Sequence, residues 1–315
     1  MPEIIDPAAF AGLDPSKPIV ALEGETMGTT WRVLYVGPDA PDGVQLAIKA
    51  LLATLDDQLS HWNPASRLCA FNRAPAGSWI TLPHHLASVM DTALRVAAVS
   101  NGAFDPSIGA LVDLWGFGPP GPKPTPDDAA ISEALAVSGW RRLRWDPAAR
   151  RLRQPGGLSL DLSGIAKGYA ADAIADLLGA RGLVHALVEV GGELVGRGVQ
   201  PDGSPWWVDL ESPPGLNVEP IRAALHGIAV ATSGNYVRGA HSIDPRNGRP
   251  SDNNVASVSV LAETAMLADA LATAWTIAFP NDDFRDMNVA ARIITHADSG
   301  AVEHLTPAMA RMLCM

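Results

Sequence analysis

Cysteine is nearly absent from this sequence: the only two, Cys69 and Cys314, lie far apart and match no metal-ligand spacing. The chain therefore has neither a disulfide framework nor a cysteine-based zinc site. Also missing is any uninterrupted apolar run of roughly 18 residues, so no transmembrane segment is expected. Residues 1–17 lack the basic region and apolar core of a signal peptide. We therefore expect a cytoplasmic protein, or a periplasmic or exported one if a leader has been removed.

Positive charge is also in short supply, with 23 Lys and Arg against 34 Asp and Glu and a formal net charge of −11 at pH 7. A surface of that sign repels phosphate backbones, so no nucleic-acid partner is expected. An anionic ligand would need local compensation from a metal ion, a few basic side chains or a helix N-terminus. No Gly-x-Gly-x-x-Gly pattern follows an early strand, which argues against an oxidoreductase of the dinucleotide-binding fold.

Helical and strand patterns are interspersed along the chain without a regular repeat. Apolar spacing predicts helices over residues 45–59, 84–98, 127–137, 164–178 and 263–278. Strands are predicted over residues 26–36, 142–145, 158–162, 184–190, 206–210, 227–232 and 255–261, with a closing hairpin over residues 289–296 and 301–305. Residues 60–72 and 118–126 have the composition of loops. This order predicts an α+β fold with at least one largely antiparallel sheet.

The predicted strands are spread over the whole chain, so no internal domain boundary is expected. Residues 1–20, which are acidic and proline-containing, are predicted to be an N-terminal extension that is poorly ordered or lies on the surface. Residues 21–315 are predicted to form a single domain. The 47% share of hydrophobic residues is ample for a folded core.

Asp269 and Thr273 stand four residues apart in a predicted helix and hence share one face. Both side chains offer oxygen, which suits a hard cation such as Mg²⁺. The same spacing also fits two polar side chains on the solvated face of a helix. The pair alone leaves both interpretations open.

Residues 160–172 (LDLSGIAKGYAAD) pass from an apolar segment into a helix. Free N–H groups at the helix start, with Lys167 nearby, could bind a phosphate. Gly164 and Gly168 would allow a ligand to approach the backbone closely. The alternative is an ordinary capped helix with a surface lysine.

Four further segments carry polar or flat side chains at predicted element ends. They are residues 102–109 (GAFDPSIG), 189–193 (EVGGE), 231–235 (ATSGN) and 241–250 (HSIDPRNGRP). His241 could act as a general base, because neutral imidazole suits proton transfer near pH 7. Each of these segments is equally compatible with a turn, a loop or core packing when considered alone.

Taken together and in this order, the segments resemble the ApbE family of FAD:protein FMN transferases. The matching pieces are residues 25–31 (ETMGTTW), 59–72 (LSHWNPASRLCAFN), 102–117 (GAFDPSIGALVDLWGF), 161–172 (DLSGIAKGYAAD), 189–193, 231–250 and 255–273. The resemblance spans about residues 20–305 and implies an ApbE-like fold, in which mixed and antiparallel sheets with helices form two intimate lobes around an FAD cleft.

The resemblance also implies residue roles. The metal site would consist of Asp269, Thr273 and the main-chain carbonyls of Ala166 and Ala272. The residues implied to contact FAD are Met27, Trp62, Ala103, Phe104, Asp105, Ser163, Lys167, Tyr169, Gly191, Gly192, Thr232, Ser233 and Ile243. His241 would lie beside the reacting pyrophosphate and act with Asp269 in catalysis.

The implied activity is a Mg²⁺-dependent transfer, or one dependent on another divalent cation. The FMN half of FAD, the substrate, moves to a Ser or Thr hydroxyl of an acceptor protein, and AMP is released. Two alternatives remain open at this point. One is a metal-dependent FAD pyrophosphatase that gives FMN and AMP, and the other is a non-catalytic FAD-binding protein.

Overall fold

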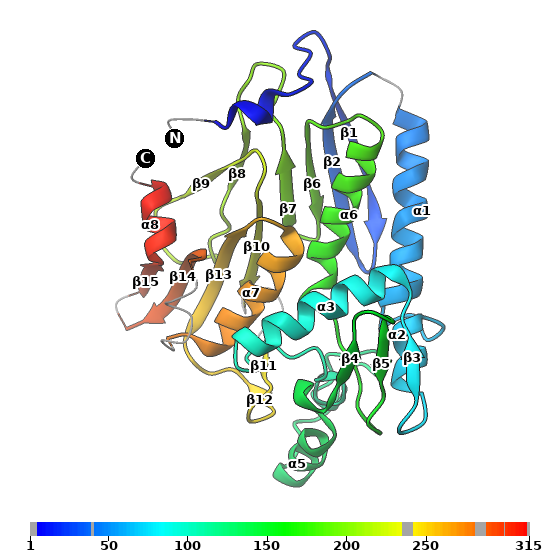
Figure 1. Cartoon of the computed structure of the whole chain (residues 1–315). Helices are drawn as coiled ribbons and strands as arrows, with labels where there is room; N and C mark the ends of the chain where they lie inside the picture. Colours follow the sequence, from blue (N-terminus) through cyan, green and yellow to red (C-terminus); the bar gives the residue numbers. More distant parts are fainter. Residues whose placement is uncertain (1–4, 39–40, 235–241, 281–287, 299, 314–315) are drawn as a thin grey trace.

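The computed structural model describes residues 5–38, 41–234, 242–280, 288–298 and 300–313. An eight-stranded sheet with the order β1-β2-β6-β7-β10-β13-β14-β15 forms its centre, and every neighbouring pair is antiparallel (Figure 1). The strands are β1 (Ile19–Thr26), β2 (Thr29–Val36), β6 (Ala186–Val190), β7 (Glu193–Arg197), β10 (Ala229–Gly234), β13 (Val255–Ala262), β14 (Ala290–Ala297) and β15 (Gly300–Leu305). Strands from the first and last fifths of the chain thus share one sheet.

Helices cover one face of this sheet (Figure 1). They are α1 (Pro41–Leu59), α3 (His84–Val99), α6 (Ala166–Ala180) and α7 (Ala265–Ala278). Their apolar stripes and the inward strand residues form the main core, in which Val33, Leu86 and Leu271 are fully buried. Burial of such stripes is the dominant favourable term in folding. The helices α6 and α7 pack against each other and against the central strands, and both carry predicted site residues.

The opposite face carries a smaller cluster of apolar side chains. The hairpin of β8 (Trp206–Asp209) and β9 (Arg222–Leu225) and the helix α8 (Pro307–Leu313) supply Trp206, Leu225 and Met309 to it. The first described segment includes a 3₁₀ helix, η1 (Pro7–Phe10), whose start is capped by the side chain of Asp6.

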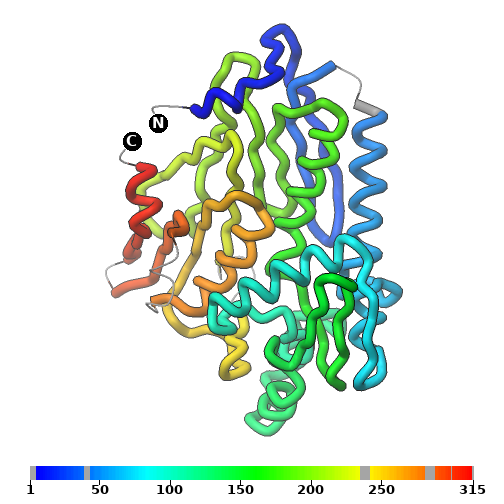
Figure 2. The backbone as a smooth tube through the Cα atoms, in the orientation of Figure 1, coloured from blue at the N-terminus to red at the C-terminus, as the bar shows by residue number. Residues whose placement is uncertain are grey.

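Between α1 and α6 the chain leaves the large sheet and builds the lower part of the molecule (cyan and green in Figure 2). This part contains α2 (Arg67–Asn72), α4 (Gly109–Leu114), α5 (Asp128–Val137), η2 (Trp140–Arg142) and a three-stranded sheet of β3 (Trp79–Thr81), β5 (Arg151–Arg153) and β4 (Arg144–Asp146). The short hairpin of β11 (Ile243–Asp244) and β12 (Arg249–Pro250) joins it from later in the chain, and Trp115 Nε1 donates to the carbonyl of Gly248 at 2.8 Å.

The predicted α+β class is confirmed, but two local predictions are wrong. Residues 60–72 are not all loop, because Ser66 caps the short helix α2 by accepting the N–H of Cys69. Residues 158–162 form no strand and make only one bridge, Ile108 to Ser159. The side-chain amide of Asn72 bonds both the N–H and the carbonyl of Leu160, at 2.8 and 3.1 Å, and so replaces a neighbouring strand.

Strand β1 was not predicted, although exposed side chains alternate along it with buried or half-buried ones, as in a strand with one solvated face. None of the described helices has the length and apolar character that crossing a bilayer requires.

Candidate functional site

The helices α6 and α7 contact each other backbone to backbone. The N–H of Gly168 in α6 donates to Asp269 Oδ2 in α7 at 3.0 Å. A Cβ added at Gly168 would meet the carbonyl of Ala265 and, at 2.8 Å, the nitrogen of Met266. Only glycine permits this approach. The predicted Asp269 therefore lies directly against the predicted start of α6, although 101 residues separate it from Gly168.

Lys167 lies between two carboxylates at this junction. Its Nζ is ion-paired with Glu193 Oε1 at the start of β7 and lies 4.0 Å from Asp269 Oδ1. Both carboxylate side chains are buried, whereas that of Lys167 keeps about a third of its surface exposed. The lysine thus compensates buried negative charge, while part of its side chain remains exposed to solvent.

Burial disturbs the acid–base behaviour of both carboxyl groups. Burial, and then the nearby Asp269, raise the pKa of Glu193 to about 8, against the opposing effect of Lys167. Burial also raises the pKa of Asp269, which Lys167 and the Gly168 N–H oppose. Two carboxylates share one ammonium group, so the ionised cluster carries an excess negative charge away from water. Such a cluster favours either a proton or an additional cation.

A polar atom without a partner lies in the same cluster. Glu193 Oε2 is buried and accepts no hydrogen bond from the described residues. A buried oxygen without a hydrogen-bond partner destabilises the fold unless a bound ligand supplies the missing contact. The donor set of oxygens around Asp269 therefore fits a hard divalent cation.

Thr273 and the segment before α6 complete the metal-ligand candidates. A Cβ added at Gly164 would lie 2.8 Å from Thr273 Oγ1, so the backbone at Gly164 packs closely against the threonine side chain. Ala166 is the first residue of α6. The carbonyl of Ala272 already accepts the hydroxyl of Thr276 at 2.8 Å. Within the described ranges no group of three or more His, Cys, Asp and Glu could hold a metal, so a cation here would depend on hydroxyl, carbonyl, water or substrate oxygens.

Two tight turns contain predicted site residues. Met27 and Gly28, both with positive φ (46° and 71°), turn β1 into β2, and Gly191 and Gly192 turn β6 into β7. A Cβ at Gly191 would lie 3.0 Å from Lys167 Cδ and 3.0 Å from the side chain of Thr29. Gly191 therefore lies against the side chain of Lys167, and the turn from β1 into β2 reaches Gly191 through Thr29.

A second group of predicted residues lies at the end of the loop that leads into α6. Ser163 donates both its N–H and its hydroxyl to Asp161 Oδ1, at 2.8 and 2.6 Å. The other oxygen of Asp161 is 3.7 Å from His61 Nδ1. Trp62, the next residue, is 59% exposed, and its ring centroid lies 5.4 Å from that of His61. An exposed indole here is free to stack on a flat ring.

The loop between α3 and α4 abuts this group, since the N–H of Asp161 donates to the carbonyl of Pro106 at 2.9 Å. Asp105 accepts the N–H and hydroxyl of Ser107 and the N–H of Trp140, and burial raises its pKa. Ala103 and Phe104 are buried in the main core. Asp105 thus fixes the shape of the loop.

The remaining predicted residues make contacts outside these two groups. The hydroxyl of Tyr169 is 2.7 Å from His85 Nδ1 of α3. Thr232 bonds Ser259 of the neighbouring strand at 2.8 Å, and Ser233 follows it on β10. Ile243 packs with Leu111 and Ala134 in the lower part. The predicted base, His241, lies outside the described residues.

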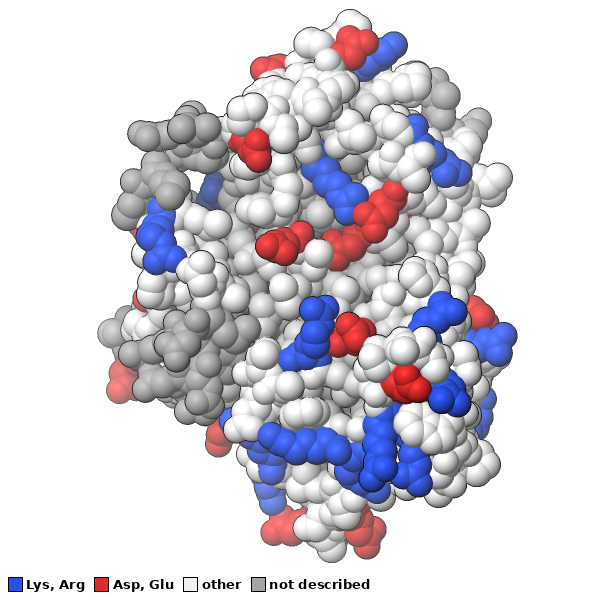
Figure 3. Space-filling view, in the orientation of Figure 1, with Lys and Arg blue, Asp and Glu red and all other residues white. Residues whose placement is uncertain are grey.

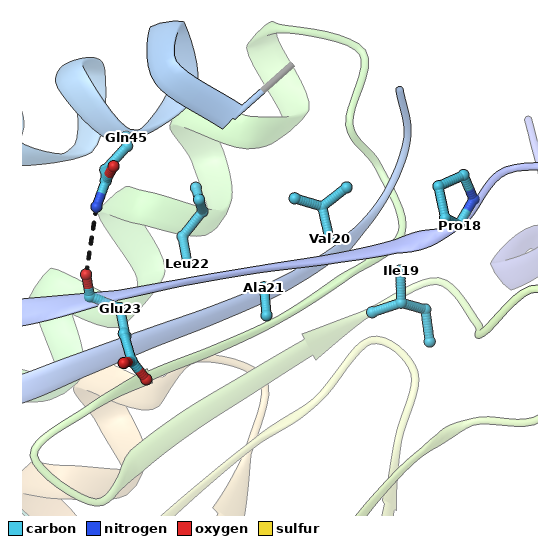
Figure 4. Close-up of a pocket in the computed structure, with 7 residues that line it drawn as sticks. All are labelled: Pro18, Ile19, Val20, Ala21, Leu22, Glu23 and Gln45. Carbon is cyan, nitrogen blue, oxygen red and sulfur yellow. Dashed lines mark hydrogen bonds between the residues drawn. The ribbon is translucent and has the colours of Figure 1, made fainter. Parts of the chain in front are cut away.

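A further cavity, of about 490 Å³, lies along the edge strand β1 (Figure 4). It is lined by Pro18, residues 19–23 and Gln45 of α1, whose Nε2 donates to the carbonyl of Glu23 at 3.4 Å. Its lining shares no residue with the predicted site, so it has no part in the chemistry described above.

Sequence reasoning missed three residues that hold the site together: Glu193, Asp161 and Asp172. Glu193 directly follows the Gly191–Gly192 turn, and an acid after such a turn was a usable signal. Asp172 accepts the N–H groups of Ala265 and Met266, at 2.9 and 2.8 Å, at the start of α7. Its partners are 93 and 94 residues away, which no local pattern indicates.

Asp172 is expected to make stability depend on pH. Burial raises its pKa to about 6, although its two backbone hydrogen bonds oppose the rise. Because this pKa exceeds that of the unfolded chain, the contribution of Asp172 to stability is full at low pH and is lost as the pH rises through about 6. Between about pH 4 and pH 7, the wild type should therefore lose roughly 2 kcal/mol of unfolding free energy relative to Asp172→Asn.

Urea denaturation of both proteins at the two pH values measures this difference. Glu133→Gln, a change at an exposed acidic residue of α5, serves as the control and should follow the wild-type pH profile. Parallel pH profiles of the wild type and Asp172→Asn would contradict the assignment.

Comparison with known proteins extends these observations. The ApbE family model matches residues 27–290. A Vibrio cholerae serotype O1 protein named FAD:protein FMN transferase is 35% identical over 278 residues, which cover 84% of this chain and 83% of the relative. One of the same name from Salmonella typhimurium is 38% identical over 263 residues, covering 79% and 75%.

Solved structures agree with the sequence relatives. The apo form of the Pseudomonas stutzeri flavinyl transferase ApbE superposes with a TM-score of 0.87 at 35% identity, and the match covers 94% of this chain and 96% of that one. The ApbE protein of Thermotoga maritima superposes with a TM-score of 0.81 at 29% identity, covering 93% and 99%. The extent of the family match and these identities establish that the chain belongs to the ApbE family.

Proposed function

We propose that this protein transfers the FMN half of FAD to a Ser or Thr hydroxyl of an acceptor protein, in a reaction that depends on Mg²⁺ or another divalent cation. The observation that carries the proposal is the buried cluster of Lys167, Glu193 and Asp269 where α6 meets α7. It combines oxygen ligands for a divalent cation with the ammonium group of Lys167, and both would offset the negative charge of a pyrophosphate. The names of the family relatives support the same reaction.

The proposed reaction is a phosphoryl-type transfer. The acceptor oxygen forms a bond to the FMN phosphorus, the bond from that phosphorus to the bridging oxygen breaks, and AMP leaves with the electron pair. The hydroxyl proton passes to a base, for which His241 is the candidate. No electron is transferred, so FAD is a substrate and not a redox carrier.

Asp269, Thr273 and the carbonyls of Ala166 and Ala272 would hold the cation. When bound, a divalent cation neutralises charge on the phosphate oxygens and the leaving group. Glu193 holds the ammonium group of Lys167 beside Asp269. In that position the ammonium group would add positive charge next to the pyrophosphate. The first N–H groups of α6 are already engaged, because Ala166 donates to the carbonyl of Leu162 at 2.9 Å and Gly168 donates to Asp269 Oδ2 at 3.0 Å. The positive charge of this site would therefore come from Lys167 and the cation.

The flavin and adenosine parts of FAD would lie along the two groups of residues described above. The proposed contacts are Met27, Trp62, Ala103, Phe104, Asp105, Ser163, Lys167, Tyr169, Gly191, Gly192, Thr232, Ser233 and Ile243. In this proposal residues 21–315 act as one domain, with the FAD cleft between the large sheet and the lower part of the molecule.

Intact-mass spectrometry of an acceptor peptide tests the proposal. The resemblance to the ApbE family implies an acceptor motif of the form Asp-x-x-Ser/Thr-Gly-Ala-Ser/Thr. With FAD and Mg²⁺, a peptide that carries this motif should gain the mass of one FMN phosphoester while AMP appears in equal amount. The same peptide with its acceptor hydroxyl residue replaced by Ala should gain none. Release of FMN and AMP without a mass gain would indicate a pyrophosphatase instead, and binding of FAD without AMP release would indicate a flavin-binding protein.

A further inference from the structure

Charge is distributed unevenly over this acidic chain. Residues 67–153 contain 10 of its 23 Lys and Arg but only 7 of its 34 Asp and Glu. In the view of Figure 3, basic side chains gather over the lower part of the molecule, where the three-stranded sheet lies. A local excess of one sign inside a chain of the opposite sign is a candidate interaction surface.

The three-stranded sheet arranges part of this charge on one face. Trp79 of β3 is in register with Arg153 of β5, which is in register with Arg144 of β4. Side chains alternate along a strand, so Arg151 shares this face, while Ile80 and Leu152 point into the core. Arg150 adds a further exposed guanidinium group at the β4–β5 turn. We call this set, Trp79, Arg144, Arg150, Arg151 and Arg153, the arginine face.

The arginine face is electrostatically unfavourable within the isolated chain. Like charges directly opposite each other on neighbouring strands are destabilising, and Arg144 is directly opposite Arg153. Arg151 alone has an acidic partner, Asp146 at 3.2 Å, and its guanidinium lies 5.6 Å from the ring centroid of Trp79. Arg144, Arg150 and Arg153 form no ion pair with the part of the chain that the structure describes. Their charge is therefore available to a partner.

We infer that the arginine face docks an acidic segment of the acceptor protein. The inference rests on the proposed function in one respect, that the second substrate is a polypeptide. Guanidinium groups bind carboxylates in a bidentate manner, and Trp79, 45% exposed, offers a flat apolar surface between them. An acidic acceptor is repelled by most of this chain, so a basic face would set where and how it approaches.

An anionic bilayer is a less suitable partner for this face. Interfacial membrane binding relies on an apolar stripe that enters the lipid, and the arginine face has a single large apolar side chain. Its short strands instead present guanidinium groups at strand spacing, which matches an extended acidic peptide.

Fluorescence anisotropy with labelled poly-L-glutamate tests the inference at low salt. The variant Arg144→Gln/Arg150→Gln/Arg153→Gln leaves Trp79 and the Arg151–Asp146 pair in place. Its control, Arg32→Gln/Lys49→Gln/Arg181→Gln, removes the same charge from exposed positions elsewhere. The arginine-face variant should bind poly-L-glutamate about tenfold more weakly than the control variant, because charge-assisted contacts are lost. Equal affinity of the two variants would overturn the inference.

Three further measurements separate this inference from the proposed function. With FAD, Mg²⁺ and saturating acceptor peptide, both variants should release AMP at the wild-type rate, which shows that the catalytic cluster is intact. If wild type binds poly-L-glutamate through this face but never modifies the acceptor peptide, the proposed function fails and the docking face stands. If wild type binds phosphatidylglycerol vesicles through these arginines and ignores poly-L-glutamate, the docking inference is wrong.

Discussion

Replacing Asp269 by Asn is expected to lower the rate of AMP release from FAD in the presence of Mg²⁺ by about 1,000-fold or more. A bound cation contributes several kcal/mol of transition-state stabilisation, and each 1.4 kcal/mol or so is about tenfold in rate. Asn has the size of Asp, and its carbonyl oxygen can still accept the N–H of Gly168 that lies 3.0 Å from Oδ2. The fold should therefore persist while the charge that holds the cation is lost.

Asp176→Asn is the matched control for this change. Asp176 lies exposed on α6 and pairs with Arg197 at 2.6 Å, well outside the buried cluster. Its rate should stay within about twofold of the wild type, because exposed ion pairs contribute little. Normal turnover by the Asp269→Asn variant would show that Asp269 does not hold the cation.

Gly168→Ala is expected to lower the free energy of unfolding by about 3 kcal/mol or more, and to abolish activity with it. The added Cβ would lie 2.5 Å from the carbonyl carbon of Ala265 and 2.8 Å from the nitrogen of Met266. Both are backbone atoms of the first turn of α7, so no side chain can rotate out of the way. The two helices must separate, and the hydrogen bond from Gly168 to Asp269 is then lost.

The control for Gly168 lies on the same helix. A Cβ at Gly179 would meet only the Arg197 guanidinium, at 3.9 Å. Gly179→Ala should therefore stabilise the protein slightly, by about 0.5–1 kcal/mol, since Ala is the better helix former. Urea denaturation measures both variants. A Gly168→Ala protein as stable as Gly179→Ala would mean that the α6–α7 contact is looser than the structure indicates.

Long periodic segments were predictable from sequence because they obey a local rule. The predicted helix over residues 84–98 matches α3, and the one over residues 263–278 matches α7 to within two residues at its start. Their apolar stripes face the core, which is the pattern the spacing encodes. The segment over residues 158–162 failed because a distant side chain, Asn72, supplies the hydrogen bonds that a neighbouring strand would have made.

The proposed site residues were identified singly from the sequence, and their arrangement was not. Asp269 and Lys167 were identified by type and spacing, and the structure brings them together. Their shared partner, Glu193, was not assigned a role, because its meaning depends on a strand order that pairs β6 with both β2 and β7. Asp172 was missed because its hydrogen-bond partners lie more than 90 residues away in the chain, on another helix.

The central claim is that the junction of α6 and α7 holds a divalent cation for FMN transfer, and Mn²⁺ binding tests it most directly. Electron paramagnetic resonance can count bound Mn²⁺ in the presence of FAD, independently of turnover. The account predicts one bound Mn²⁺ per chain in the wild type and in Asp176→Asn, and none in Asp269→Asn at the same free concentration. Undiminished Mn²⁺ binding by Asp269→Asn would contradict it.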